Sequence, residues 1–402
     1  MIGRKVNVKK IKKISSILMT AVFVAALCGA MITFIFTDKE DTSYYENRSL
    51  AKVPEFTWEG ALDGSLFTAL GTYVKDHAPA REELLAGKTW TDINVLRRPV
   101  VNDIYLGDGV LLPYFPHEEV DTSEIADKAA AVADRFYERV RLTESFGGEY
   151  YFVAMPCQYT CYADEYPDYL NNRSEYLTSA KNAFLTELTE RGVNTLDMGE
   201  VYESAGRPDY FTSTVDHHFG IMGAYDTYRE VLSLHSKKTG ETLDVLEADE
   251  FDVEYLPNKY VGSRLRKIFG LWESDEKLGV IIPKADIPYT RYNNGNLVAS
   301  SVLDLPESEE DDVLYTAYMG GDVAHTVIDT GRDELPTVLI YGESFTNAIE
   351  TFLWHGFDEM HSLDLRYAEE GAFESLVEEV KPDIVICVRD YSVLLETEGY
   401  GH

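Results

Sequence analysis

The chain has one continuous apolar run near its N-terminus, and elsewhere apolar and polar positions alternate over short distances. Residues 14–36 are apolar except for a few small polar side chains, and about 20 such residues suffice to cross a bilayer. Residues 1–13 carry basic residues and no acidic one, which predicts a cytoplasmic basic tail by the positive-inside rule. We therefore predict an uncleaved transmembrane anchor over 14–36, a cell-membrane location and an extracytoplasmic ectodomain.

A cleavable signal peptide is the alternative interpretation of this segment. Small residues that suit a cleavage site occur over Ala25–Ala30. The apolar run continues past them to Phe36, which favours an anchor.

The next part of the chain changes from a polar stalk to helical spacing. Residues 37–54 are polar and are predicted to form a stalk and an extended arm. Over 55–98, aromatic and aliphatic residues recur at helical spacing with glycine and proline breaks, which predicts two or three helices. Residues 101–112 alternate around an Asp-Gly turn and predict a hairpin, and an amphipathic helix is expected over 122–146.

From residue 150 onward, short apolar runs alternate with helical stretches. This pattern is typical of parallel strands joined by helices, so it predicts an α/β fold with a central parallel sheet in a three-layer sandwich. Residues 239–330 interrupt the pattern with few helical signals and are predicted to form a β-rich insertion within one ectodomain over 55–402. The strands are expected at 150–156, 193–196, 338–341, 359–363 and 383–388, and the helices at 174–191, 221–234, 345–354 and 372–380.

Charge and cysteine content narrow the classes of partner. The 402 residues include 70 acidic and 36 basic ones, a net charge of −34, so nucleic acid is a poor partner for the body of the protein. The four cysteines form no disulfide framework. Cys157 and Cys161 are spaced either to close a small disulfide or to remain free thiols, and both alternatives stay open.

Ser344 is predicted to lie at a strand-to-helix corner. The run Val338–Tyr341 predicts a buried strand, Gly342 permits a tight turn, and helical spacing resumes at Phe345. The free N–H groups of a first helical turn suit an oxyanion, so this corner suits a nucleophile. The alternative is that Ser344 only caps the helix.

The segment Thr214–Gly220 holds the densest group of titratable residues. If it is extended, Asp216 and His218 share one face and His217 points away. A carboxylate that accepts the imidazole Nδ1–H leaves Nε2 as a base, which predicts a triad with Ser344. The alternatives are a surface Asp–His pair and a metal site. Neighbouring histidines on an extended segment cannot both reach one ion, so we expect neither a metal nor another cofactor.

These two segments together resemble the bacterial DHHW family, which is related to the alginate O-acetyltransferases of the AlgX and AlgJ type in the SGNH-hydrolase-like superfamily. The resemblance covers residues from about Tyr44 to Leu394. Further segments match in the same order: the arm Glu46–Leu50, the hairpin with Gly107-Asp108-Gly109, Tyr162–Pro167 after Pro156, and Val261-Gly262-Ser263 ahead of Arg264, Arg266 and Lys267.

The resemblance implies Ser344 as nucleophile, His218 as general base and Asp216 as the acid that orients it. The family's usual Trp is Phe219 here, and its usual Asp before the serine is Glu343, whose role the sequence leaves unassigned. The implied activity is O-acetyl transfer to, or hydrolysis from, a cell-surface polysaccharide. The resemblance also implies that a multi-spanning membrane O-acyltransferase would supply the acetyl group.

Other residues are candidates for binding the substrate. Basic side chains would suit an anionic glycan, although they are equally well explained as solvated charges. Residues after the strand 359–363 lie at a sheet edge where ligands gather, although an ion pair with Asp364 is the stronger interpretation there. The candidates are His217, Glu343, Asn347, Arg264, Arg266, Arg366 and Tyr367.

Two other functions are compatible with the sequence. A non-catalytic protein of the same fold could bind or scaffold glycans. A metal-dependent phosphoesterase would need further Asp-x-Asp clusters near strand ends, and the sequence offers no convincing one.

Overall fold

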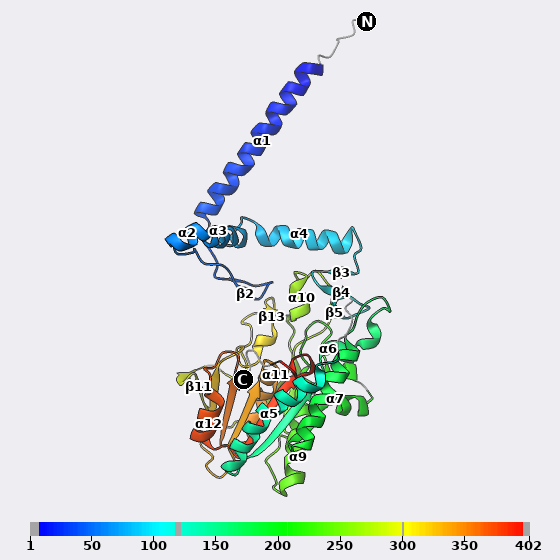
Figure 1. Ribbon diagram of the computed structural model, residues 1–402, viewed down its shortest axis with the longest axis vertical. Helices are drawn as coiled ribbons and strands as arrows, with labels where there is room; N and C mark the ends of the chain where they lie inside the picture. Colours follow the sequence, from blue (N-terminus) through cyan, green and yellow to red (C-terminus); the bar gives the residue numbers. More distant parts are fainter. Residues whose placement is uncertain (1–7, 117–121, 207, 300, 397–402) are drawn as a thin grey trace. The chain divides into compact units, whose positions relative to one another are not determined.

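The computed structural model describes residues 8–116, 122–206, 208–299 and 301–396 (Figure 1). The chain forms two compact units: Met1–Arg98 with Arg266–Leu271, and Pro99–Leu265 with Trp272–His402. This division differs from the domain boundary at residue 55 predicted from sequence, because the helices that follow the stalk belong to the N-terminal unit. The first seven residues of the predicted basic tail lie outside the described residues.

The N-terminal unit begins with a long apolar helix. The part of α1 from Lys12 to Phe36 is long and apolar enough to cross a membrane. In the arm, β1 and β2 pair antiparallel. The Thr57 hydroxyl accepts the Gly60 N–H and caps α2, and Gly64 ends that helix in the left-handed conformation. The elements are α1 (Val8–Phe36), β1 (Thr42–Ser43), β2 (Arg48–Ser49), α2 (Trp58–Asp63), α3 (Ser65–Asp76) and α4 (Arg81–Asn94).

The larger unit is built on an eight-stranded mixed sheet, counted over the residues that the structure describes, in the order β12-β11-β14-β16-β15-β17-β6-β7. The five strands from β16 to β7 are parallel, as the sequence predicts. The runs of the central strands β15 and β17 are fully buried because helices cover both faces. These strands are β6 (Glu149–Met155), β7 (Asn194–Asp197), β15 (Val338–Gly342), β16 (Glu359–Asp364) and β17 (Ile384–Asp390).

The sheet is mixed, because part of the insertion extends the parallel strands on one side. β14 pairs antiparallel with β16 and carries β11 and β12 beyond it. The period-2 burial of β14 fits an edge region with one buried face. These strands are β11 (Thr290–Asn293), β12 (Asn296–Val298) and β14 (His325–Asp329).

Helices cover the two faces of the sheet, which gives the predicted three layers (Figure 1). One face packs Tyr150, Phe152 and Tyr341 into a core with α5, α7 and α12. On the other face, the Tyr151 hydroxyl lies 3.0 Å from His235 Nδ1 of α9, and α11 packs beside α9. The helices are α5 (Ile125–Ser145), α7 (Ser174–Glu190), α9 (Ile221–Thr239), α11 (Phe345–Leu353) and α12 (Ala372–Val380).

Shorter elements complete the larger unit. The predicted hairpin is a three-stranded meander of β3, β4 and β5. The remaining elements are β3 (Val100–Val101), β4 (Ile104–Leu106), β5 (Leu111–Pro113), α6 (Gln158–Cys161), α8 (Met198–Ser204), β8 (Phe251–Tyr255), β9 (Lys259–Tyr260), α10 (Ser263–Lys267, which ends in the N-terminal unit), β10 (Gly279–Pro283) and β13 (Asp312–Val313).

Candidate active site

Ser344 lies at the corner between β15 and α11, at the carboxyl edge of the parallel strands. Ligands of such sheets bind at this edge. Gly342 is required at the corner, since a Cβ there would collide with the Val388 carbonyl of β17. The Ser344 hydroxyl makes no capping bond to α11. Its Oγ instead lies 2.7 Å from His218 Nε2.

The histidine segment is a tight loop, so the premise that it is extended is wrong. A bridge between Thr212 and Phe219 closes the loop. Inside it, Ser213 Oγ accepts the N–H groups of Val215 and Asp216 at 3.1 and 2.9 Å. Such bonds from a serine hydroxyl to the nearby backbone favour turns over extended chain.

Asp216 and His218 form a buried pair within this loop. Asp216 Oδ1 lies 2.6 Å from His218 Nδ1 and also accepts the His218 N–H at 3.0 Å. Asp216 Oδ2 accepts the Ser263 N–H at 2.5 Å. Burial opposes ionisation of Asp216, but the adjacent histidines and this N–H hold the pKa of its carboxyl well below the usual range. The carboxylate therefore stays charged and orients the imidazole.

Aromatic rings enclose the His218 imidazole. Tyr315 lies parallel to it, with ring centroids 3.6 Å apart and planes 7° apart. Phe345 approaches at 5.0 Å, and Phe219 packs on Phe345 at 5.2 Å. Phe219, which replaces the family's usual Trp, thus still supplies an aromatic wall.

His217 also contacts Asp216. Its Nδ1 lies 2.7 Å from Ser263 Oγ and 3.3 Å from Asp216 Oδ1, and its ring is 3.7 Å from that of His218. The loop therefore brings together three potential metal ligands that the extended premise kept apart: Asp216, His217 and His218. Both ring nitrogens of His218 are already hydrogen-bonded, to Asp216 and Ser344.

Glu343 is buried beneath the corner. Its Oε1 accepts the backbone N–H of Asp390, at the end of β17, at 3.2 Å. Burial and the nearby Asp390 carboxylate raise the pKa of Glu343 to about 8. The side chain thus joins two strand ends.

Asn347 and Arg366 meet at Asp322. Asn347 Nδ2 donates to Asp322 Oδ1 at 2.9 Å, and Arg366 Nη2 donates to Asp322 Oδ2 at 3.0 Å. Arg366 also pairs with Asp364 at 2.6 Å, so the ion pair considered from the sequence is present. The ring of Tyr367 is exposed, and the guanidinium of Arg366 lies 5.5 Å from its centroid.

The two other predicted arginines belong to different units. Arg264 is half-buried in the larger unit, where its Nε donates to Gln158 Oε1 at 3.5 Å, and burial lowers its pKa. Arg266 belongs to the N-terminal unit, where its Nε donates to the Tyr44 carbonyl at 2.8 Å. The structure therefore does not group these two side chains.

The cysteine pair is not bonded. Cys157 and Cys161 are both free thiols, and burial raises the pKa of each. Cys157 Sγ donates to Asp390 Oδ1 at 3.5 Å, and Asp390 is the residue whose backbone N–H Glu343 accepts.

A cleft of about 550 Å³ is lined by the histidine loop and the residues around it. Ser213, Thr214 and Phe219 contribute from the loop. Glu276 accepts the Thr214 N–H at 2.7 Å, and burial raises the pKa of its carboxyl. The wall also carries aromatic and acidic side chains: Tyr162, Asp209, Tyr210, Tyr255, Tyr260, Glu273, Asp275 and Tyr318.

Sequence reasoning assigned no role to several residues that contact the candidate site. Tyr315 and Asp322 lie in the insertion, and no spacing ties them to the histidines. Ser263 follows Gly262, where a Cβ would come within 2.5 Å of the Val215 carbonyl oxygen. Gly262 was therefore the sequence signal that the backbone before Ser263 passes close to another backbone segment, since glycine has no Cβ.

One family model matches part of the chain. Residues 114–293 match the family model described as SGNH hydrolase-like domain, acetyltransferase AlgX. This part of the chain is similar to that family, and the match covers less than half of the 402 residues. No protein in the curated set matches the sequence significantly.

Two solved structures share the fold of this chain. The structure of Bacillus cereus PatB1 with a sulfonyl adduct has a TM-score of 0.60 at 18% identity over 74% of this chain and 98% of its own. A DHHW family protein from Eubacterium siraeum has a TM-score of 0.54 at 18% identity over 75% of this chain and 95% of its own. The resemblance to the DHHW family and the SGNH-like fold expected from the sequence are confirmed.

Proposed function

We propose that this protein is an extracytoplasmic, serine-dependent acyltransferase or esterase acting on O-acetyl groups of a cell-surface polysaccharide. The observation that carries the proposal is the hydrogen-bonded chain from Asp216 through His218 to Ser344, with contacts of 2.6 and 2.7 Å. Contacts of this length match a nucleophile, its base and the group that orients the base.

The chemistry would run in two steps. In the first, His218 Nε2 takes the Ser344 proton as Oγ bonds to the ester carbonyl carbon. The oxyanion faces the Ser344 N–H at the start of α11, where the helix dipole favours negative charge. His218 then returns the proton to the leaving alcohol as the C–O bond breaks, which leaves Ser344 acylated.

In the second step, an acceptor hydroxyl replaces the leaving alcohol. His218 removes its proton while the acceptor oxygen attacks the acyl carbon, and the same proton returns to Ser344 Oγ when the acyl–serine bond breaks. A sugar acceptor gives transfer and water gives hydrolysis. Under this proposal, a multi-spanning membrane O-acyltransferase supplies the acetyl group in the cell.

The cleft beside the histidine loop has a lining that suits a glycan, although Asp216, His218 and Ser344 are not among its lining residues. Tyrosine rings can stack on sugar rings, and carboxylates can accept sugar hydroxyls. The lining of the cleft holds more acidic side chains than basic ones. Its lysine, Lys277, is already engaged, because Nζ donates to the Asn258 carbonyl at 3.0 Å. The cleft therefore suits a neutral or amino-bearing glycan better than the anionic one considered from the sequence.

The test is ester hydrolysis by the full chain in detergent, with 4-nitrophenyl acetate as substrate. Ser344→Ala should lower kcat at least about 10³-fold, whereas the matched control Ser375→Ala, at an exposed serine of α12, should not change it. A sulfonyl fluoride should add one sulfonyl group to Ser344, read by peptide mass spectrometry. Full activity in Ser344→Ala would refute the proposal, and an inactive wild type that leaves surface acetylation unchanged would favour a glycan-binding role.

A further inference from the structure

An exposed apolar face lies on the helices that follow the arm. Phe67, Leu70 and Val74 of α3 are spaced i, i+3 and i+7, so they lie on one side of that helix. Phe56, Trp58 and Leu62 extend the group through α2, with Phe56 and Trp58 in edge-to-face contact at 5.1 Å. We call these six residues the apolar face; their exposed fractions run from 37% for Leu70 to 87% for Leu62.

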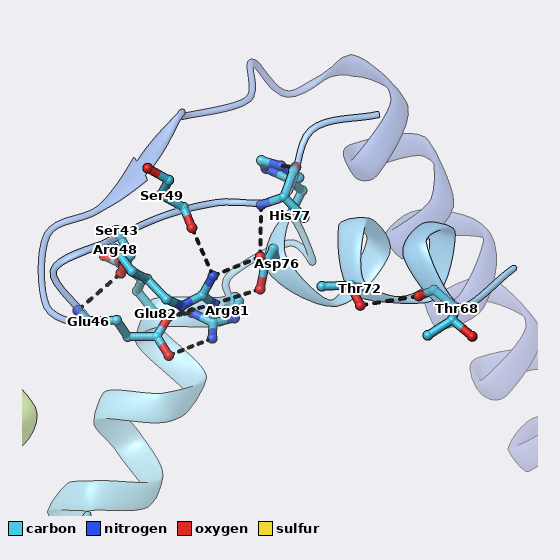
Figure 2. A network of polar contacts seen from close by, with 11 residues as sticks. Ser43, Glu46, Arg48, Ser49, Thr68, Thr72, Asp76, His77, Arg81 and Glu82 are labelled. Carbon is cyan, nitrogen blue, oxygen red and sulfur yellow. Dashed lines mark hydrogen bonds and ion pairs between the residues drawn. The ribbon is translucent and has the colours of Figure 1, made fainter. Parts of the chain in front are cut away.

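Polar contacts occupy a different side of α3 (Figure 2). Asp76 receives two hydrogen bonds from Arg48 of the arm, at 2.7 and 2.9 Å, and one from the Ala51 N–H at 3.0 Å. The arginine holds the pKa of Asp76 well below its usual range. His77 Nε2 also lies 2.9 Å from the Ala51 carbonyl oxygen. The arm thus binds the Asp76 side of the helix, and Phe67, Leu70 and Val74 face elsewhere.

The C-terminal end of α1 contacts α3 directly. Phe34, in the last turn of α1, meets Tyr73 of α3 edge to face, with ring centroids 6.0 Å apart. Lys39 Nζ donates to the Phe34 carbonyl at 2.5 Å and lies 4.1 Å from the centre of its ring. If α1 crosses a bilayer, the last turn of α3 lies at the level where α1 leaves it.

We propose that α2 and α3 lie on the surface of the bilayer that α1 enters, with the apolar face inserted at the boundary between headgroups and acyl chains. Tryptophan and phenylalanine are favoured at this depth, and interfacial helices bind through such a face. A group of exposed apolar side chains of this kind otherwise marks an interface with a partner.

Apolar burial, not charge, drives the insertion. The charged residues within α2 are Glu59 and Asp63, and α3 carries Lys75 and the arm-bound Asp76. Acidic residues outnumber basic ones in these two helices, so their charge does not attract them to anionic lipid. The proposal rests on α1 as a membrane anchor and is independent of the acyl-transfer chemistry.

Spin labels on the full chain test the proposal. The background is Cys28→Ser with Cys161→Ser, reconstituted into phosphatidylcholine vesicles, and flotation with the vesicles first checks the anchor. Labels at Leu62→Cys and Leu70→Cys should be accessible to oxygen and protected from a water-soluble nickel chelate. Labels at the matched controls Thr68→Cys and Thr72→Cys, which lie on the polar side of α3, should show the reverse.

Neither 0.5 M salt nor added phosphatidylglycerol should change this result. Chelate access at Leu62 and Leu70 equal to that at Thr72 would overturn the proposal, as would failure to float. Protection from both oxygen and chelate would also overturn it, because protein would then cover the face; dipolar broadening between labels would identify that protein as a second copy.

A label-free measurement covers the case in which a cysteine variant does not fold. Brominated phosphatidylcholine should quench wild-type fluorescence more than that of Trp58→Phe. Equal quenching of the two proteins would contradict the insertion of Trp58.

Discussion

The phenol ring of Tyr315 lies flat against the imidazole of His218, 3.6 Å away and within 7° of parallel. Tyr315 comes from the insertion, and only 7% of its surface is exposed. A stacked ring on one face of the imidazole and the Asp216 carboxylate at its edge together fix the plane in which Nε2 points at Ser344.

The stack predicts a positioning role for the Tyr315 ring. Tyr315→Leu should lower kcat/KM for 4-nitrophenyl acetate by up to about tenfold, since an aromatic pair contributes about 0.5–1.5 kcal/mol beyond its buried area. Tyr315→Phe keeps the ring and should restore most of the activity. Loss in both variants to the same extent would assign the effect to the hydroxyl instead.

Gly262 is predicted to control the placement of Asp216. A Cβ at Gly262 would lie 2.5 Å from the Val215 carbonyl oxygen and 2.8 Å from the Asp216 Cβ, so Gly262→Ala must push α10 away from the loop. Overpacking of this kind costs about 1–3 kcal/mol, and we expect kcat/KM to fall about 10- to 100-fold as Ser263 leaves Asp216. Gly87→Ala in α4, where a Cβ meets no atom within 4 Å, is the control and should be neutral.

The two adjacent histidines should differ sharply in their effect on ester hydrolysis. His218→Gln removes the base and should lower kcat at least about 10³-fold. His217→Gln changes the contacts with Ser263 and Asp216 but leaves the base in place, so a loss of about 1 kcal/mol, below about tenfold, is expected. Equal losses would mean that both rings act on the serine.

Glu343 should make the stability of the protein fall with rising pH. Its pKa is raised from 4.5 to about 8 in the folded protein, so between these values the folded state binds a proton that the unfolded state has lost. The stabilisation is complete below about pH 4.5 and is lost as the pH rises through about 8. Glu343→Gln should therefore flatten the fall in Tm between about pH 4.5 and 8.

Thermal melts of the full chain at several pH values check this expectation. The exposed Glu370→Gln serves as the control and should keep the wild-type slope. An unchanged slope in Glu343→Gln would show that other carboxyl groups cause the pH dependence.

Chelators should leave the esterase activity unchanged. Asp216, His217 and His218 are close enough to bind an ion, but binding through His218 would break its bond to Asp216 or Ser344. Dialysis against EDTA followed by assay, with and without added Zn²⁺, tests this point. Loss on dialysis and recovery with zinc would return the metal-dependent phosphoesterase to consideration.

Local patterns in the sequence were enough to predict the parallel strands and the corner at Ser344. The buried run Val338–Tyr341 and Gly342 each leave a local signal, and the observed elements follow them. The shape of the histidine loop depends on Ser213 and on a bridge between Thr212 and Phe219, so an extended interpretation of the segment was wrong.

Long-range relationships left no such signal. The pairing of β14 with β16 and the stack of Tyr315 on His218 join residues that share no periodicity. The role of Glu343 likewise depends on Asp390, which the chain reaches only after two further strands.

The antiparallel strands at the edge of the sheet bear on which segment of this chain could be transplanted into a related protein. The family match ends at residue 293, the last residue of β11, whereas the partner strand β14, Tyr315 and Asp322 all follow it. A graft of the matched segment alone would carry Asp216 and His218 without the ring that holds the imidazole and without the serine. A transplantable piece must run through β17, because β16 and β17 flank the strand that leads to Ser344, so the insertion is carried together with the chemistry.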